Sequence, residues 1–366
     1  MNGPKEKILY LMASPAWGGG EQYVADLILG MERMGYECYA VVPLGGELVA
    51  EKLEAVLPPE RIFMLRMRSM FDVASIKEVS RIVQRVGNNV IHANKFADAF
   101  IAAKARRIAR NGAKVIMTRH LVRKGKTGRL YRKLYSELDR MVFVSDMARR
   151  EFLSAGAEID PGKVYVVHTG VADAPQVGDR PGTMPPVIAF AGRVVPEKGL
   201  DVLFEALKDI TSREFNVKII GSGEDKYIDS LKQKAADGGF AEKVRFTGFT
   251  DDVNGELQEA SIGVLPSIVP EGFGLAAVEY MRASLAVVTT GNGAQREFLD
   301  DGKEALIVPP GDARALGEAL DKLLSDGDMC RRLGQAGRKR YEEELSFDKY
   351  IGRMDGLYKS LLAVDN

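Results

Sequence analysis

The chain has 366 residues, of which 46% are hydrophobic, 8% aromatic and 28% charged. This is the composition of a folded globular protein and excludes a fibrous or disordered chain. Lys+Arg and Asp+Glu both number 51, so the formal net charge is zero. One hydrophobic core rarely suffices at this length, and we expect two domains.

The cysteines and the hydropathy pattern indicate in which cellular compartment the protein is found. The two cysteines, Cys38 and Cys330, lie far apart in the chain, which argues against a disulfide scaffold or a structural zinc site and favours a reducing compartment. No apolar run approaches the roughly 18 residues of a membrane span. The apolar stretch 8–13 is too short for the core of a signal peptide and resembles a buried strand. We therefore expect a cytoplasmic protein.

The balanced net charge conceals an asymmetry between the two halves. Residues 1–180 contain 28 basic and 20 acidic residues, and residues 181–366 contain 23 and 31. Basic residues cluster at 104–110 and 123–133. These clusters could be solvated faces of helices. They could also form a surface that binds an anionic substrate or an anionic membrane. Nucleic acid is not expected, because the aromatic stacking pattern typical of its binders is missing.

Short apolar runs alternate with stretches of helical period in the first half of the chain. Strands are predicted at 8–13, 37–42, 62–65, 90–93, 114–118, 141–144 and 164–167, and helices near 21–34, 47–56, 73–86, 96–110, 127–137 and 146–154. Continuous apolar strands separated by helices are typical of a parallel sheet covered on both faces. The pattern predicts an α/β, doubly wound domain.

The same pattern restarts after a segment at 174–186 that is rich in Pro and Gly. Further strands are predicted at 187–191, 217–220, 244–246, 262–265, 286–289 and 305–308, followed by three helical stretches, the last at 347–362. This organisation predicts a Rossmann-like domain at 1–176, a linker at 177–186, a second Rossmann-like domain at 187–345 and a C-terminal helix at 346–366.

Open parallel sheets bind ligands at the carboxyl ends of their strands, so we expect the ligand-binding residues in the turns that follow the strands. Gly18 and Gly19 follow the first strand and precede a helix, which suits a phosphate, although a plain tight turn explains them equally well. Arg193 and Lys198 follow the first strand of the second half. This pair could bind a diphosphate, or it could be two solvated loop cations.

Two carboxylates flank the start of a helix in the second half. Glu271 precedes a glycine-rich first turn, and Glu279 lies about two turns into the helix. Apolar neighbours at 275–278 predict a largely buried helix, in which a carboxylate needs a partner such as a ribose diol. The amides of Phe273, Gly274 and Leu275 at the helix start could bind phosphate or sugar oxygens.

The sequence GRVVPEKG at 192–199, followed by EGFGLAAVEYM from Glu271, is similar to the retaining glycosyltransferases of family 4 (group 1), which have the GT-B fold. The Glu-x7-Glu pattern is complete at Glu271 and Glu279. The segments GGGE, FVSDMARREF, GSGED, RFTGFTDDV and VVTTGNGAQREFLDDG extend the resemblance over nearly the whole chain. The resemblance implies two Rossmann-like domains facing across a cleft, with the C-terminal helix returning to the N-terminal domain.

The resemblance also implies where each substrate binds. The nucleotide-sugar donor binds the C-terminal domain, where Arg193 and Lys198 hold its diphosphate in place of a metal ion, so no metal and no other cofactor is expected. Glu279 binds the ribose. The remaining donor contacts come from Glu271, Gly272, Phe273, Gly274 and Leu275 at the sugar, from Gly248, Phe249 and Thr250 at the base, and from Gly18 and Gly19 at the diphosphate.

The acceptor is expected on the N-terminal domain, with Arg123 and Lys124 among its contacts. The resemblance places His120 beside the transferred sugar, although a histidine that ends a strand is otherwise more often structural; the case for His92 and His168 is weaker. Thr169 departs from the asparagine that is usual in the family, which puts a side-chain role there in doubt.

We therefore predict a retaining, metal-independent glycosyltransferase that moves a sugar from a nucleoside diphosphate sugar, with UDP favoured over GDP, to a glycan or lipid-linked glycan. Cell-envelope polysaccharide or lipopolysaccharide synthesis is the expected setting, with peripheral contact at the anionic inner face of the cell membrane. Glu271 is the one nearby carboxylate, and the family places it as a sugar ligand, so front-face attack is favoured over double displacement. The alternatives are a GT-B nucleotide-sugar epimerase and a non-catalytic nucleotide- or carbohydrate-binding protein. An NAD-dependent dehydrogenase is disfavoured, because GxGxxG is missing.

Overall fold

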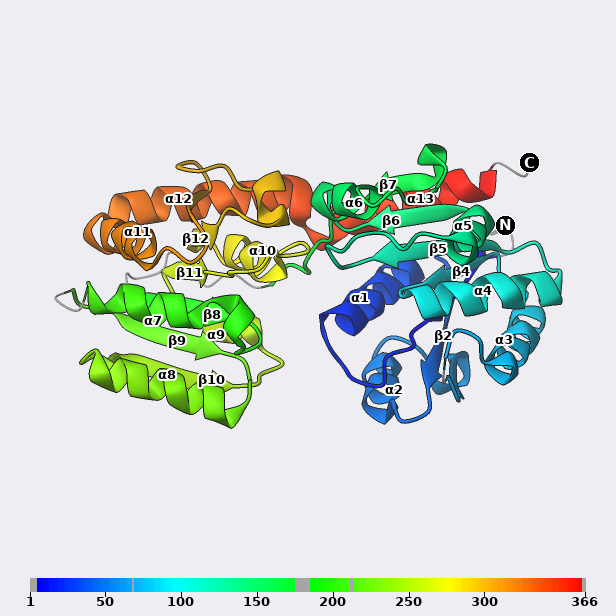
Figure 1. The fold of residues 1–366 in the computed structure, drawn as a ribbon, viewed down its shortest axis with the longest axis horizontal. Helices are drawn as coiled ribbons and strands as arrows, with labels where there is room; N and C mark the ends of the chain where they lie inside the picture. The colour runs from blue at the N-terminus through cyan, green and yellow to red at the C-terminus, as the bar shows by residue number, and fades with distance from the viewer. Residues whose placement is uncertain (1–4, 68, 175–184, 211–212, 364–366) are drawn as a thin grey trace. The chain divides into compact units, whose positions relative to one another are not determined.

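The computed structural model describes residues 5–67, 69–174, 185–210 and 213–363. The chain forms two compact units (Figure 1). Unit 1 comprises Met1–Thr169 together with Asp348–Asn366, and unit 2 comprises Gly170–Phe347. Each unit is described by itself. The predicted linker 177–186 lies outside the described residues up to position 184.

Unit 1 is built on a seven-stranded sheet of order β3-β2-β1-β4-β5-β6-β7. Its strands are β1 (Lys7–Leu11), β2 (Glu37–Pro43), β3 (Ile62–Leu65), β4 (Val90–Ala93), β5 (Lys114–Arg119), β6 (Arg140–Phe143) and β7 (Val164–Val166). All neighbouring strands are parallel, so the predicted doubly wound sheet is confirmed. The strand order reverses between β1 and β4, the point at which such sheets bind ligands.

The helices of unit 1 start and stop at local signals. They are α1 (Gly19–Arg33), α2 (Glu47–Glu54), α3 (Val73–Val86), α4 (Phe96–Ala109), α5 (Arg129–Glu137), α6 (Asp146–Leu153) and α13 (Phe347–Leu362). The Asp72 carboxylate caps α3 by accepting from the amides of Ala74 and Ser75. Gly87, at φ 64°, ends that helix in the left-handed conformation that glycine adopts easily.

The two faces of the unit 1 sheet pack against different helices. Leu9 and Leu11 of β1 belong to a core that includes α3 and α4. Tyr10 points to the opposite face, as the alternation along a strand requires, and its hydroxyl lies 3.3 Å from that of Tyr358 on α13. The C-terminal helix is therefore part of the core of unit 1.

Unit 2 has a six-stranded parallel sheet of order β10-β9-β8-β11-β12-β13. Its strands are β8 (Val187–Ala191), β9 (Asn216–Ile220), β10 (Val244–Gly248), β11 (Ile262–Leu265), β12 (Ala286–Thr290) and β13 (Ala305–Val308). A register shift between Phe246 and Gly248 lets β10 continue two residues beyond the predicted end at 246. This second doubly wound sheet confirms the predicted fold class.

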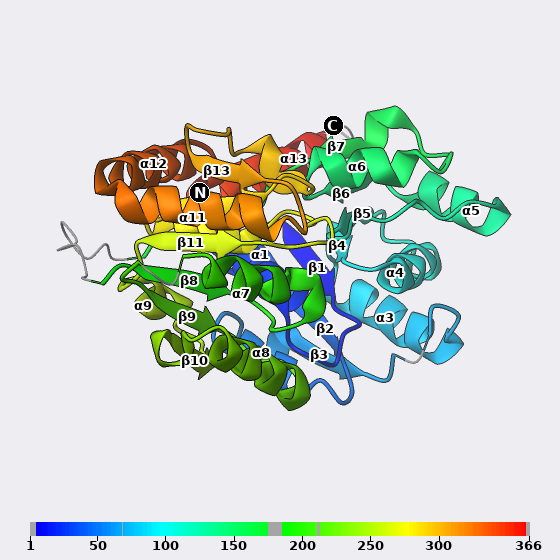
Figure 2. The ribbon, with the colours of Figure 1, turned by 60° about the vertical axis from the view of Figure 1, so that its left-hand side comes forward.

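The helices of unit 2 are α7 (Leu200–Lys208), α8 (Asp225–Asp237), α9 (Val253–Leu257), α10 (Leu275–Arg282), α11 (Ala313–Ser325) and α12 (Gly327–Arg340), with a π-helical turn at Tyr341–Leu345. Short 3-10 turns occur at Pro59–Arg61, Pro161–Lys163, Pro196–Lys198, Ala241–Lys243 and Ala294–Glu297. Helices α7 and α11 contact each other on one side of the unit 2 sheet (Figure 2). The hydrophobic core between the sheet and α7 includes Phe190 and Ile219 of the sheet and Phe204 of the helix.

Candidate active site

The loop after β8 lies against the loop after β9, with no room for side chains between them. The amide of Val194 donates to the Ser222 carbonyl at 2.8 Å. A Cβ added to Gly221 would lie 1.9 Å from the Gly192 carbonyl oxygen, and one added to Gly223 would lie 1.9 Å from that of Val194. The glycines of the GSGED segment are therefore needed for packing, and they fix the backbone from which Arg193 and Lys198 extend.

A second close approach fixes the end of this loop. Gly199 follows the turn Pro196–Lys198 at φ 72°, and a Cβ there would lie 2.0 Å from the Pro266 carbonyl oxygen. The amide of Ile268 donates to the Glu197 carbonyl at 3.0 Å. The loop that carries Lys198 is thus tied to the loop after β11.

Lys198 and Glu271 form the central ion pair of unit 2. The Lys198 Nζ donates to Glu271 Oε1 at 2.7 Å, and the two side chains are 22% and 13% exposed. The Ser267 hydroxyl donates to the same oxygen. An ammonium group has three donors, so Lys198 can bind Glu271 and still donate to a ligand. Arg193 lies exposed on the same loop.

The loops after β11 and β12 hold Glu271 in place. Its backbone carbonyl accepts from the amide of Ala294 at 3.1 Å. A Cβ on Gly293 would lie 2.6 Å from the Glu271 amide. The carbonyl of Ser267 accepts from Thr290 Oγ1 at 2.8 Å. The carboxylate is therefore positioned before any ligand binds.

Helix α10 begins at Leu275, shortly after Glu271 in the chain, and carries Glu279. Gly274 precedes the helix at φ 89°, a conformation suited to glycine. Glu279 is half-buried. The adjacent Tyr280 is fully buried, and its hydroxyl accepts from the Ala191 amide at 2.7 Å and donates to the Val264 carbonyl at 3.2 Å. Burial raises the pKa of Tyr280, and the nearby charges of Glu279 and Glu271 add to this effect.

An exposed aromatic residue follows β10. Gly248 has φ 76°, and the next residue, Phe249, is 69% exposed. The Thr250 hydroxyl accepts from the Asp252 amide at 3.0 Å, which shapes the turn into α9. An aromatic ring left in solvent at the carboxyl end of a strand is available for stacking on a ligand.

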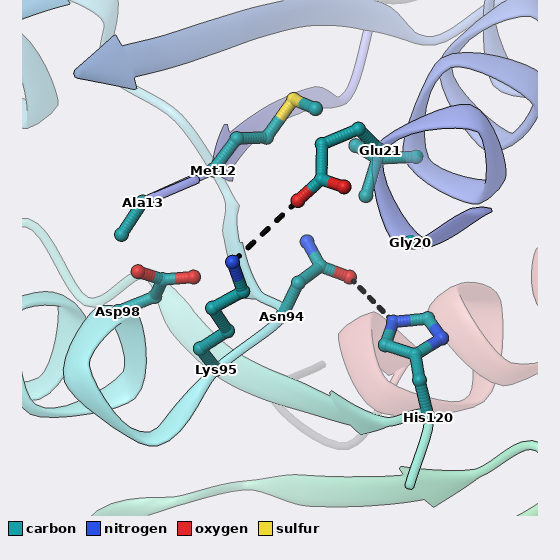
Figure 3. Close-up of a pocket in the computed structure, with 9 residues that line it drawn as sticks. Met12, Ala13, Gly20, Glu21, Asn94, Lys95, Asp98 and His120 are labelled. Atoms are coloured by element: carbon teal, nitrogen blue, oxygen red, sulfur yellow. Dashed lines mark hydrogen bonds and ion pairs between the residues drawn. The ribbon is translucent and has the colours of Figure 1, made fainter. Parts of the chain in front are cut away.

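In unit 1, His120 lines a small pocket at the carboxyl ends of β1, β4 and β5 (Figure 3). Its Nε2 lies 3.3 Å from Asn94 Oδ1, and its ring packs edge-on against Tyr23 at 4.5 Å. Burial lowers the pKa of His120 to about 4, with smaller contributions from Arg119 and Lys95. The imidazole is therefore neutral near pH 7.

His92 occupies a different environment from His120. It is 0% exposed and bonds to the Tyr358 hydroxyl at 2.6 Å and to the Thr118 hydroxyl at 2.7 Å. Burial lowers its pKa to about 3, and His120 adds to this effect. Both ring nitrogens are satisfied inside unit 1, which makes His92 a structural residue.

The other residues expected in unit 1 do not line this pocket. Gly18 is the N-cap of α1, and Gly19 begins the helix; Gly20 is the glycine that reaches the pocket. Arg123 and Lys124 are exposed on the segment between β5 and α5.

Four polar residues of the pocket could not be assigned to it from the sequence: Glu21, Asn94, Lys95 and Asp98. Lys95 Nζ lies 3.5 Å from Glu21 Oε1. Asp98 is 0% exposed, although it stands among apolar residues of α4. The sequence signal for Asp98 is an acidic side chain in the otherwise apolar stretch FADAFIAA. This signal is weak, because acidic residues are common in the first turn of a helix.

The part of the chain that the structure describes lacks two other features. It contains no group of three or more His, Cys, Asp or Glu side chains placed to hold a metal ion. None of its helices has both the length and the apolar character that crossing a bilayer requires.

Two doubly wound parallel-sheet units of this kind are the architecture of the GT-B fold. Residues 17–174 match the model of Glycosyltransferase Family 4, and residues 178–340 match that of Glycosyl transferases group 1. The chain therefore belongs to the group 1 glycosyltransferases of family 4, and the predicted family is confirmed.

Two related glycosyltransferases match this chain over part of their own length. A phosphatidyl-myo-inositol mannosyltransferase of Mycobacterium leprae is 34% identical over 212 residues, which are 55% of this chain and 54% of that protein. The lipopolysaccharide core biosynthesis glycosyltransferase LpsE of Rhizobium meliloti is 28% identical over 57% of this chain and 59% of its own. The chain thus matches a little over half the length of these relatives.

Solved structures agree over nearly the whole chain. A glycosyltransferase from Rickettsia africae has a TM-score of 0.84 at 21% identity and covers 98% of this chain and 99% of its own. Anabaena HepE in complex with UDP and glucose has a TM-score of 0.79 at 18% identity, covering 97% and 100%. At these identities the likeness establishes the fold.

Proposed function

We propose that the protein is a retaining glycosyltransferase that moves a sugar from a nucleoside diphosphate sugar, with UDP favoured, to a hydroxyl of a glycan or lipid-linked glycan. The observation that carries the proposal is the Lys198–Glu271 pair, 2.7 Å apart at the carboxyl edge of the unit 2 sheet beside the start of α10. Membership in the family and the UDP complex of Anabaena HepE support a donor of this class.

The proposed chemistry needs fixed positive charge at the leaving group. Breaking a glycosyl–phosphate bond leaves negative charge on the diphosphate, and preorganised cations stabilise that charge as it develops. Lys198 is already oriented by Glu271, so little reorganisation is needed when the donor binds. Arg193, exposed on the same loop, would add a planar pair of donors to the diphosphate. These two cations would replace a metal ion.

The remaining groups of unit 2 would orient the donor. Glu279 would accept hydrogen bonds from the ribose hydroxyls, and Phe249 would stack on the base. Glu271 would hold a hydroxyl of the transferred sugar, because Lys198 and Ser267 both bind one of its two oxygens and the other can accept from a ligand. A carboxylate committed in this way favours front-face attack, in which the leaving phosphate accepts the proton of the acceptor hydroxyl.

The acceptor would bind unit 1. Exposed Arg123 and Lys124 lie between the exposed side chains of Leu121 and Leu130, which are 52% and 42% exposed. Cations interspersed with apolar side chains suit a surface of anionic lipid. We propose that this segment brings the protein into peripheral contact with a membrane that carries a lipid-linked acceptor.

The test measures sugar release and transfer from UDP-glucose, UDP-galactose, UDP-N-acetylglucosamine and GDP-mannose. Lys198→Ala should lower turnover by at least 100-fold, because it removes a transition-state contact. The exposed Lys232→Ala on α8 is the control and should turn over normally. Near-native turnover of Lys198→Ala would refute the proposed role.

Two further readouts separate the proposal from its alternatives. NMR of the first product should show the donor's anomeric configuration retained, and addition of EDTA should leave turnover unchanged. An inverted product would contradict the retaining mechanism, and a covalent sugar on Glu271 would contradict front-face attack. Epimerised nucleotide sugar in place of transfer would identify an epimerase.

A further inference from the structure

Strand β9 of unit 2 carries a lysine at a position where a core strand normally has an apolar residue. Lys218 stands between Val217 and Ile219 in the stretch NVKII, and its side chain is only 6% exposed. A buried charge loses its hydration, so it persists only where partners compensate for that loss. The strand pairing adds to the cost, because Arg245 of β10 is the register neighbour of Lys218 and like charges repel each other.

The partners of Lys218 come from helix α9 and the turn that follows it. The Lys218 Nζ lies 3.1 Å from the Glu256 carboxylate and donates to the Glu256 backbone carbonyl at 3.2 Å. It also donates to the carboxylate of Glu259, and this hydrogen bond and the charge of Lys218 lower the pKa of Glu259. An ammonium group has three donors, so this set satisfies it. Lys218 therefore fixes the C-terminal end of α9 to the sheet.

Helix α9 has few other means of attachment. It is five residues long, and Leu257 is the one among them that is buried. A helix of this length is not stable by itself, so its position depends on its contacts with the rest of unit 2. The contacts of Lys218 with Glu256 and Glu259 are a charged link of this kind.

Helix α9 continues directly from the loop that carries the exposed ring of Phe249. At the start of this loop, the Gly248 carbonyl accepts from the amide of Gly221 at 2.9 Å. At its end, the Asp252 carboxylate caps α9 by accepting from the Gly255 amide at 2.8 Å. The loop therefore has two anchors, the backbone of the sheet at one end and α9 at the other.

We propose that Lys218 is a positioning residue for the base of the nucleotide: by holding α9 in place, it sets the position of Phe249 and so determines how well that ring stacks on the base. The inference rests on the proposed function, in which Phe249 contacts the base. Lys218 acts through the loop and not by contact with the donor. One base–aromatic stack contributes about tenfold or more to affinity, and this is the effect that Lys218 controls.

The proposed contacts to the diphosphate and to the base come from different parts of unit 2. Arg193 and Lys198 extend from the loop after β8, whose backbone packs directly against the loop after β9, whereas Phe249 depends on α9. Loss of the Lys218 ammonium should therefore weaken the base contact and spare the diphosphate contact. The fold should survive this loss, because the Glu259 side chain is 62% exposed and stays hydrated without its partner.

The experiment measures binding of UDP and of pyrophosphate, which has no base, by calorimetry on the whole protein. Lys218→Met should weaken UDP binding about tenfold and leave pyrophosphate binding unchanged. A lysine with a merely structural role would affect both ligands alike or neither. Lys232→Met, which removes an exposed ion pair on α8, is the control and should bind both ligands like the wild type. If Lys218→Met does not fold, Glu259→Gln serves instead and should weaken UDP binding in the same selective way.

A double substitution tests whether Lys218 acts through the loop. Adding Lys218→Met to Phe249→Ala should weaken UDP binding no further, because the stacking is already lost. Three outcomes would overturn the inference while leaving the donor site intact: equal UDP affinity of Lys218→Met and the wild type, a parallel loss of pyrophosphate affinity, or additive effects of the two substitutions. A wild type that does not bind UDP would refute the proposed donor, and this inference with it, so the two failures are distinguishable.

Discussion

The buried carboxyl of Asp98 predicts a specific pH dependence of stability. Burial raises its pKa from 3.8 to about 7, so folding favours the protonated form. The contribution is fully present below pH 3.8 and is lost as pH rises through 7. Linkage across these two values gives a loss of about 3 kcal/mol between pH 5 and pH 8, at about 1.4 kcal/mol per pKa unit. Asp98→Asn, which does not titrate, should escape this loss.

The chain offers a probe that reports on unit 1. Trp17 is the one tryptophan and lies next to the N-cap of α1, so its fluorescence in urea follows unfolding of that unit. From pH 5 to pH 8, the unfolding free energy of the wild type should fall by about 3 kcal/mol relative to that of Asp98→Asn. Glu51→Gln should leave the wild-type profile unchanged. Parallel profiles for the wild type and Asp98→Asn would show that burial does not raise the pKa of Asp98.

Three other substitutions test the packing and the donor site. Gly199→Ala and Gly239→Ala both place a side chain at positive φ, but only the side chain at 199 meets other atoms within 4 Å. Gly239→Ala should lower the unfolding free energy by about 1–2 kcal/mol. Gly199→Ala should lower it further, as measured by thermal shift, and should also weaken UDP binding, as measured by calorimetry. Tyr358→Phe should destabilise unit 1 by about 1–3 kcal/mol in urea, because it leaves the Nδ1 of His92 without a partner. Tyr350→Phe, on the same helix, deprives no histidine of a partner and should cost less. Glu279→Ala should weaken UDP binding by calorimetry at least tenfold without changing the melting temperature by more than a few degrees; unchanged affinity would contradict a ribose contact.

The sequence predicted the strands well, because buried parallel strands are continuous apolar runs. The predicted strand 262–265 is β11 to the residue, and 90–93 is β4. The prediction that α5 begins at 127 was wrong by two residues: Gly128, at φ 98°, precedes the helix, which starts at Arg129. The strand order was not predicted, since periodicity carries no information on which strands pair.

Side-chain partnerships across long separations were also beyond the sequence. Lys198 and Glu271 are 73 residues apart, and pairing them required the folded sheet. The family resemblance favoured His120 over His92, but the strand pattern alone did not separate them, because both histidines lie at the ends of apolar strands. The structural difference comes from Tyr358, 266 residues beyond His92. Asp98 was missed because its burial comes from the packing of α4 against the sheet, which the local sequence does not show.

The placement of α13 in unit 1 bears on how the molecule is made. A nascent chain leaves the ribosome N-terminus first, and domains generally fold as they emerge. Tyr10 and His92 depend on Tyr358 for hydrogen bonds, yet that residue is translated only after all of unit 2. Until α13 is released, the sheet around Tyr10 and His92 therefore lacks this part of its cover. Chaperones that shield apolar surface would be needed most during that interval.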